Sequence, residues 1–153
     1  MFEPGDYINR PANGIDYFVA TVESEPLGSD IAYVYLIGCN AEITVQRSRG
    51  KEPNENGDLT EIWETIHENV KVYHETVDRS GKMTNDGLIP QAMHNMFVPE
   101  KYKVSIWDRI LMKTNVNGEF TYQQFRVESI GTNIVDMNGK GVTSVQMSMD
   151  LRV

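Results

Sequence analysis

The chain has little of what marks secreted, membrane or redox-active proteins. Cysteine occurs once, at Cys39, so no internal disulfide can form, and this favours a reducing compartment. No apolar run approaches the roughly 20 residues that a membrane helix needs, and the first residues lack the basic and apolar regions of a signal peptide. We therefore expect a protein that stays in the cytoplasm in which it is made and has no membrane partner.

Basic residues are also scarce. The 153 residues include 14 Lys or Arg against 22 Asp or Glu, which gives a net charge of −8. This charge argues against strong general attraction to the phosphates of nucleic acids. The hydrophobic fraction of 40% and the charged fraction of 24% are ordinary for a globular protein, and the length suits a single domain with one core.

Recognisable catalytic motifs are missing as well. There is no nucleophile elbow, phosphate-binding loop or dinucleotide fingerprint. His67-Glu68 begins like a zinc-protease motif, but Lys71 stands where the second histidine is required, and His74 falls on the opposite face of a continuous strand. Cys39 has the neighbours of a small buried residue at a strand end. We predict no enzyme activity, no metal and no cofactor.

Two-residue alternation of apolar and polar side chains dominates what is present. At the C-terminus Val145, Met147 and Met149 share one face, while Gln146 and Ser148 share the other, which predicts a half-buried strand. Residues 59–77 fit a helix in their first part, but their β-branched residues and later alternation favour a strand, with a bend near Asn69. Further strands are expected at residues 17–22, at 31–37, where an apolar run predicts cover on both faces, and at 43–46.

Turn signals separate these strands. Asn13-Gly14 and Asn117-Gly118 each predict a tight turn in an antiparallel hairpin. Residues 47–58 are a loop by composition, and residues 78–99 predict a long loop with a short helical turn over 90–96. With six to eight strands, we expect a single all-β domain. A small antiparallel barrel or sandwich spans residues 42–153, and residues 1–41 form an extra N-terminal hairpin.

The long predicted loop carries more apolar residues than a solvated loop needs. A loop that cannot bury such groups locally tends to use them on a partner, and methionines adapt well to imperfect surfaces. The alternative is a loop folded back over one end of the barrel. The residues we predict as a partner interface are Leu88, Ile89, Met93, His94, Met96 and Phe97.

Residues 47–51 contain a short basic stretch. Arg47, Arg49 and Lys51 fall within the predicted loop of residues 47–58. Such a cluster is typical of a solvated turn. A contact with phosphate or with a partner is the alternative.

Several features occur in a fixed order from residue 43 onward. They are Ile-Thr-Val-Gln-Arg at 43–47, a glycine-bearing loop at 56–58, a strand at 61–65 with Trp63, a strand at 69–73 before the long loop, and Asp-Arg-Ile at 108–110 before Phe-Arg-Val-Glu-Ser-Ile at 125–130. In this order they resemble the phage head-tail joining family, small β-barrel proteins also described as adaptor, stopper, head-closure or head completion proteins. Residues 1–41 have no counterpart in that pattern.

The resemblance implies a structural protein of the virion neck, assembled in the host cytoplasm. It implies a ring of identical subunits that joins the portal and head to the tail and helps retain the packaged DNA. A portal or adaptor protein would lie on one side and a tail protein on the other. It supplies no catalytic residues. An acidic ring would let DNA pass through its lumen without sequence-specific contact, because it repels phosphates.

Other functions fit the same sequence. A tail terminator or tail completion protein is the nearest alternative. A stand-alone β-barrel binding module is a second class, and an enzyme with a site of scattered residues is a third. The aromatic platform of such a module would use Tyr33, Tyr35, Tyr73, Tyr102 and Tyr122.

Overall fold

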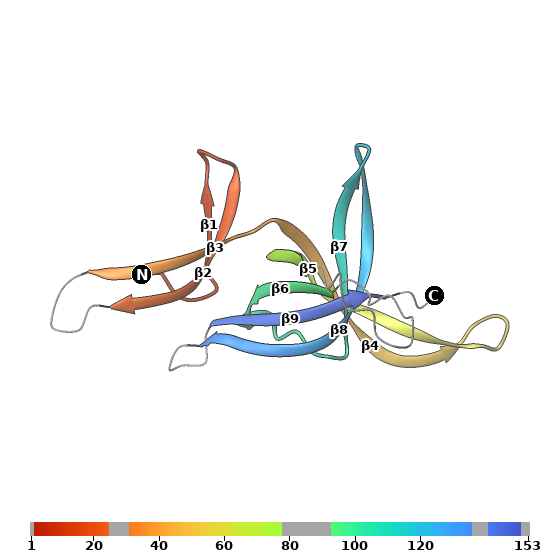
Figure 1. Cartoon of the computed structure of the whole chain (residues 1–153). Helices are drawn as coiled ribbons and strands as arrows, with labels where there is room; N and C mark the ends of the chain where they lie inside the picture. Colours follow the sequence, from red (N-terminus) through yellow and green to blue (C-terminus); the bar gives the residue numbers. More distant parts are fainter. Residues whose placement is uncertain (1, 25–30, 78–92, 136–140, 151–153) are drawn as a thin grey trace, which may run out of the picture.

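Strands make up most of the chain in this computed structural model, which describes residues 2–24, 31–77, 93–135 and 141–150 (Figure 1). The all-β fold class predicted from the sequence is confirmed. The described elements are β1 (Tyr7–Arg10), β2 (Ile15–Ser24), β3 (Ala32–Gly38), β4 (Ala41–Pro53), β5 (Leu59–Val77), β6 (Met93–Pro99), the short 3-10 helix η1 (Glu100–Tyr102), β7 (Asp108–Val116), β8 (Glu119–Val135) and β9 (Gly141–Met149).

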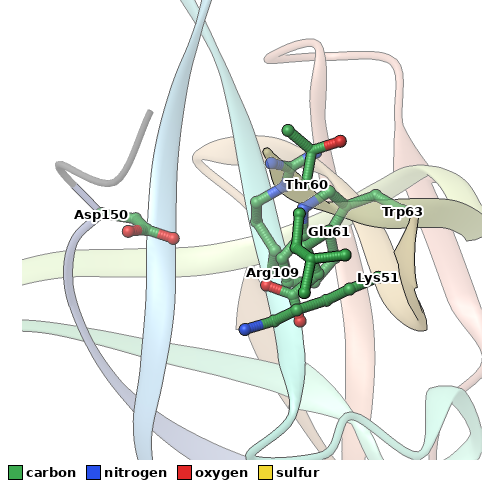
Figure 2. Close-up of a pocket in the computed structure, with 7 residues that line it drawn as sticks. Lys51, Thr60, Glu61, Trp63, Arg109 and Asp150 are labelled. Carbon is green, nitrogen blue, oxygen red and sulfur yellow. The ribbon is translucent and has the colours of Figure 1, made fainter. Parts of the chain in front are cut away.

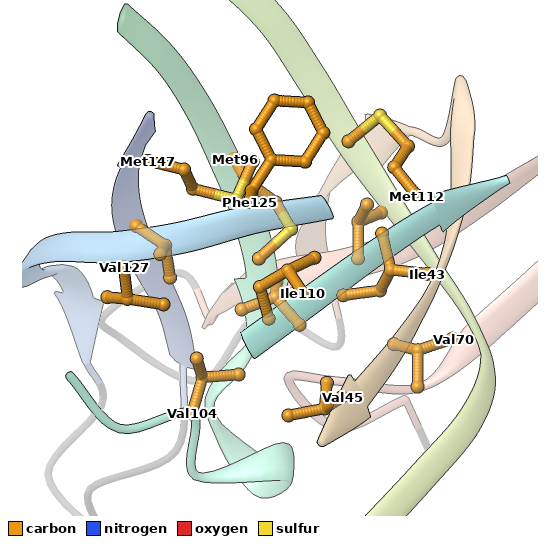
Figure 3. Close-up of a cluster of buried hydrophobic side chains, with 13 residues drawn as sticks. Ile43, Val45, Val70, Met96, Val104, Ile110, Met112, Phe125, Val127 and Met147 are labelled. Atoms are coloured by element: carbon orange, nitrogen blue, oxygen red, sulfur yellow. The ribbon is translucent and has the colours of Figure 1, made fainter. Parts of the chain in front are cut away.

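Six of these strands close into an antiparallel barrel in the order β4-β5-β6-β9-β8-β7. Pairing of β4 with β7, with Val45 opposite Ile110, completes the closure. Inward side chains alternate with outward ones along each strand, so the interior fills with apolar groups (Figure 3). This core contains Ile43, Val45, Val70, Val72, Met96, Val98, Val104, Ile110, Met112, Phe125, Val127, Val145 and Met147.

The first three strands form a separate antiparallel sheet in the order β1-β2-β3. A second, smaller cluster joins this sheet to the barrel, because Phe18 and Ala20 of β2 pack with Val142 of β9. Polar contacts strengthen the junction. The hydroxyl of Tyr7 donates to the carbonyl of Lys71 at 2.7 Å, and Lys71 forms an ion pair with Asp16.

Several strands and turns form where the sequence predicts them. Val145 and Met147 are buried in the core while Gln146 is exposed, as the predicted alternation in β9 requires. The prediction is wrong at the end of the strand, where Ser148 is buried and Met149 is exposed. Residues 59–77 are one strand, β5. Asn117 and Gly118 both have positive φ, 54° and 86°, and form the two-residue turn between β7 and β8.

The bend predicted near Asn69 is a bulge in a continuous strand. Asn69 has a φ of 54°, and the register with β4 shifts around it, since Val70 pairs with Ile43 whereas His67 pairs with Val45. A bulge strengthens the local twist and lets one long strand curve around the barrel. Val70 and Val72 after the bulge point into the core.

The prediction of a loop over residues 47–58 is wrong for most of its length. Strand β4 continues to Pro53 and pairs with β5 as far as Leu59, so the loop is reduced to a turn. That turn is closed by hydrogen bonds from the amide of Asn54 to the carbonyl of Asp58 and from the amide of Gly57 to the carbonyl of Asn54, at 2.8 and 2.9 Å. The paired segment is solvated on both faces, so it lacks the apolar alternation that identifies a strand.

The prediction of a loop over residues 78–99 is also wrong at its C-terminal end. Residues 93–99 form β6, which pairs with both β5 and β9 and is part of the barrel wall. A helical turn reaching Met96 is therefore excluded. The remainder of the predicted loop, residues 78–92, lies outside the described residues.

Two predictions for the N-terminal strands need correction. The run at 31–37 was expected to be covered on both faces, but Tyr35 and Leu36 of β3 are exposed, because β3 is the edge of its sheet and packs on the barrel only near its end. In β2 the expected alternation fails at Val19, which is buried beside Phe18 and Ala20. A register shift between Val19 and Thr21 explains this, because a bulge turns successive side chains to the same side.

Candidate interaction surfaces

The residues predicted as a partner interface fall into two groups. Leu88 and Ile89 lie outside the described residues. The others are on β6, where Met96 is buried in the core and Phe97 packs against the cluster that joins the N-terminal sheet to the barrel. Met93 and His94 are half-buried. The described part of the predicted interface therefore contributes to packing within the chain.

His94 forms a close pair with His74 of β5. Nε2 of His74 lies 2.8 Å from Nδ1 of His94, and the rings are within 14° of parallel with centroids 5.1 Å apart. This geometry places the rings edge to edge, with one proton shared between the facing nitrogens. The His94 ring also contacts Phe125 in the core, with centroids 4.7 Å apart. Burial lowers the pKa of both imidazoles.

His67 takes no part in this histidine pair. His67, which the sequence placed on the opposite face from His74, is used elsewhere, since its Nε2 donates to the carbonyl of Tyr102 at 3.0 Å. Within the described ranges, no group of three or more His, Cys, Asp or Glu is arranged to hold a metal ion. Cys39 is half-buried beside the junction cluster, and burial raises the pKa of its thiol to about 11, which keeps it protonated and unreactive.

Two hairpin arms project from the barrel (Figure 1). The β4–β5 arm consists of residues 48–53 and 59–63, beyond the last pairing of β4 with β7 at Arg47. The β7–β8 arm consists of residues 113–116 and 119–122. Each carries a large apolar side chain in solvent: Leu59 is 68% exposed and Phe120 is 64% exposed. Such groups on projecting hairpins contribute nothing to the core of the chain that carries them.

A third exposed apolar group sits on a rigid turn before β7. The Asp108 side chain is only 3% exposed and accepts from the Ser105 amide at 2.8 Å and from Arg47 at 2.7 and 3.0 Å. These bonds fix the turn, which leaves Ile106 exposed and Trp107 73% exposed. A large aromatic residue held rigidly in solvent loses little conformational freedom when a partner covers it.

A pocket of about 340 Å³ lies at the base of the β4–β5 arm (Figure 2). The guanidinium of Arg109 lies over the ring of Trp63, 4.3 Å from its centroid, and donates to Oε1 of Gln46 at 3.0 and 2.5 Å. Acidic and basic groups are mixed around the opening, so it has no marked preference for ions of one sign. The lining consists of Lys51, Leu59, Thr60, Glu61, Trp63, Arg109 and Asp150.

A wider groove of about 480 Å³ separates the β1–β2 hairpin from the β7–β8 arm. Two ion pairs lie along it, Asp16 with Lys71 and Glu42 with Lys113, the latter at 3.8 Å. The ammonium of Lys113 also lies 4.4 Å from the centroid of Phe120. The groove is shallow and its charges neutralise one another, which suits a protein segment better than a charged small molecule.

Two of the three cations in the basic stretch identified in the sequence form ion pairs. Arg47 pairs with Asp108, whose hydrogen bonds raise the pKa of the guanidinium, and Arg49 pairs with Glu64 on the neighbouring strand. Both arginines therefore have carboxylate partners within the chain, which weakens the phosphate-contact alternative. The five tyrosines of the aromatic-platform alternative come from β3, β5, η1 and β8 and do not share one strand face.

Sequence reasoning missed the most exposed of these groups. The predicted elements include Leu59 only as the start of a strand, and they assign no role to Trp107. A signal for Trp107 is present in the sequence, because Ser105 and Asp108 have the spacing of a side-chain-capped turn that leaves the two intervening residues at its surface.

Comparisons with protein-family models, with curated proteins and with solved structures find no match to this chain. No helix in the described part of the chain is long and apolar enough to cross a membrane.

Proposed function

We propose that this chain is a structural subunit of the neck of a tailed bacteriophage. Copies form a ring that joins the portal and head to the tail and helps retain the packaged DNA. The support from sequence is the order of motifs from residue 43 to residue 130. The support from structure is a small closed barrel whose largest exposed apolar groups sit on projecting arms and on a rigid turn.

The observation that carries this proposal is the exposure of Trp107, Leu59 and Phe120. Each lies outside the core, on a segment whose backbone is fixed by strand pairing or by a buried carboxylate. Exposed aromatic and large aliphatic side chains on rigid supports are typical of residues that bind another protein. The β4–β5 and β7–β8 arms point away from the barrel in different directions (Figure 1), which suits a subunit with neighbours in the ring and partners on either side of it.

The charge of the chain fits the passage of DNA. A net charge of −8 per subunit, multiplied around a ring, produces a negative field that repels phosphates from the wall of the channel. DNA would then pass without sequence-specific contact. In this proposal the ring meets a portal or adaptor protein on its head side and a tail protein on the other, and an acidic lumen reduces friction.

The proposal is tested with DNA-filled, tailless heads of the phage whose genome encodes the chain. Purified wild-type chain should sediment with the heads and reduce loss of DNA from them. Trp107→Ser should fold normally, because the side chain is outside the core, but should bind heads at least tenfold more weakly. Trp107→Phe, which keeps an aromatic ring at the same place, is the matched control and should retain most of the binding. Wild-type chain that does not associate with heads would contradict the neck assignment.

A further inference from the structure

We propose that neighbouring copies of this chain join by strand pairing, with the open edge of β3 in one copy binding the β4–β5 arm of the next. This contact deepens the proposed ring function and rests on it. The interface between neighbouring subunits of the ring would then consist of β3 and the β4–β5 arm.

The first observation is the outer edge of β3 around Tyr35 and Leu36. Strand β3 is the last strand of its sheet and pairs only with β2 within the described residues. Soluble proteins protect such edges with charged residues, prolines or bulges, because unpaired amides and carbonyls invite another strand. The sequence of β3, Ala-Tyr-Val-Tyr-Leu-Ile-Gly, contains no charged residue and no proline. Tyr35 is 50% exposed and Leu36 is exposed as well.

The second observation concerns which strands are available to pair with that edge. The barrel is closed, so its strands satisfy one another. Open edges nevertheless remain where the pairing is incomplete, and among the described strands they include β1, β3 itself, the two projecting arms, β5 before Tyr73 and β8 beyond Arg126. Strand β1 has only four residues, and its Tyr7 is bonded to Lys71 of the barrel. The β4–β5 arm offers longer edges, because β5 gains its second neighbour, β6, only from Tyr73 onward.

The third observation is the placement of the two segments. In Figure 1 the β2–β3 end of the N-terminal sheet and the β4–β5 arm extend from the molecule in opposite directions. One chain therefore cannot pair its own arm with its own β3. Two copies can do so, and the pair then keeps the open edge of one copy and the free arm of the other, so the same contact repeats. A repeated contact between two different surfaces is the kind that generates rings.

The side chains of the two segments are compatible. The arm carries Glu61 and Lys51, but β3 carries no charge, so pairing brings no like charges together. Leu59 on the arm is exposed and would gain apolar neighbours on β3. Pairing of β3 with a second β3 is a different arrangement, which closes after two copies and generates no ring.

The test uses two variants of the full chain, each with one half of the contact removed. Tyr35→Lys adds a charge to the edge of β3. The arm variant replaces residues 49–62 with Asn-Gly, so that the paired residues Ser48 and Trp63 are joined by a two-residue turn. Circular dichroism and thermal melting check that each variant is folded. Tyr35→Phe is the matched control for the edge, because it keeps the ring and adds no charge.

Sedimentation velocity then measures assembly. We expect wild-type chain and Tyr35→Phe to form species larger than a monomer as concentration rises, and each blocked variant to stay monomeric. An equal mixture of the two blocked variants should form a dimer with twice the monomer mass and nothing larger, because only the intact arm of one and the intact edge of the other can meet. If Tyr35→Lys does not fold, Leu36→Lys serves in its place.

Three results would overturn the contact. The first is a wild-type chain that stays monomeric up to about 1 mM, a concentration at which even weak specific association is detected. The others are an arm variant that associates as the wild type does, and a mixture of the two blocked variants that stays monomeric. The binding of wild-type chain to phage heads is measured separately. Head binding without arm-to-edge pairing would refute this contact and leave the neck function standing. Absence of head binding with a dimeric mixture would refute the neck function and leave the contact standing.

Discussion

The six-stranded barrel and the three-stranded N-terminal sheet bury their side chains to very different extents. The barrel encloses thirteen buried residues in one cluster and has no open edge where it is closed. In the smaller cluster between the sheet and the barrel, the buried residues are Phe18 and Ala20 from the sheet and Val142 from β9. The barrel has a core sufficient for independent stability, whereas the sheet packs on the barrel along one side, and the outer edge of β3 pairs with no other described strand.

This difference suggests that one region of the chain provides stability and another provides contacts with other proteins. Residues that fill the barrel fix the positions of the arms, of the turn before β7 and of the junction with the sheet. Residues on β3 and on the arms add little to stability and are free to serve contacts with other proteins. Substitutions in the barrel should therefore lower the free energy of unfolding. Substitutions on β3 and on the arms should instead weaken assembly.

The largest effect is expected for Phe125→Ala. Phe125 is fully buried in the barrel and contacts the His94 ring, so removal of its side chain leaves a cavity that the surrounding strands cannot close. We expect the free energy of unfolding to fall by about 3–5 kcal/mol. Urea denaturation followed by circular dichroism measures this loss.

The matched substitution on the sheet is Tyr35→Ala, which also removes an aromatic ring. Because Tyr35 is half in solvent and at a sheet edge, the free energy of unfolding of the isolated chain should change by less than about 1 kcal/mol. Equal losses for Phe125→Ala and Tyr35→Ala would mean that β3 is as much a part of the core as β8, and the contrast between the two regions would fail.

The sequence predicts the barrel better than it predicts the projecting parts, for a physical reason. In the middle of β9 the apolar Val145 and Met147 are buried and Gln146 between them is exposed, and this alternation identifies the strand. The turn at Asn117-Gly118 is local and depends only on the two residues that adopt positive φ. Residues 48–53 form a strand because they pair with 59–63, yet no side chain of that arm is fully buried, so no apolar alternation marks it.

The errors at β6 and β3 have a different origin. Prolines at 90 and 99 suggest a loop, but residues 93–99 are held between β5 and β9, partners that are distant in the sequence. The apolar run at β3 predicts cover on both faces, but Tyr35 and Leu36 are exposed among the described residues. Composition indicates that these side chains favour burial, but it does not show whether the same chain buries them. Likewise, the exposure of Trp107 depends on the burial of Asp108, which sequence spacing alone does not establish.

The next prediction concerns how the histidine pair makes the stability of the barrel depend on pH. Burial lowers the pKa of His74 and His94 below the ordinary 6.5, so the unfolded chain binds protons at a pH where the folded chain does not. The free energy of unfolding should therefore be highest above pH 6.5 and fall as the pH drops below it, until the folded histidines also become protonated. Glu75 is the charged neighbour of His74 on its own strand, and its charge opposes this shift only in part.

The measurement is the urea midpoint at pH 7.5 and at pH 5.5 for the wild-type chain and for the double variant His74→Gln, His94→Gln. Glutamine keeps a hydrogen-bonding side chain but does not titrate in this range. The wild-type midpoint should fall more between the two pH values than that of the double variant. Parallel profiles would show that the pair is not linked to barrel stability.

The smallest effect is expected at the junction of the two regions, for Lys71→Met. The ammonium of Lys71 donates a hydrogen bond to the carboxylate of Asp16, and this bond holds the pKa of Asp16 below its ordinary value of 3.8. A depressed carboxyl pKa stabilises the folded chain above that value, and the contribution is lost as the pH falls through the folded pKa. In Lys71→Met the pKa of Asp16 should rise and this stabilisation should disappear, while Met keeps the apolar stem of the side chain.

The readout for Lys71→Met is local, because an exposed ion pair contributes little to global unfolding and is screened by salt. Amide hydrogen exchange at neutral pH should speed up in β1 and β2 and stay unchanged in β8 and β9, since the pair ties the sheet to the barrel without entering the barrel core. The titration of the Asp16 carboxyl, followed by NMR, should shift upward. Faster exchange throughout the barrel would show that the sheet and the barrel unfold as one unit, and that the sheet is a structural part of the barrel and not an attachment free to serve a neighbouring copy.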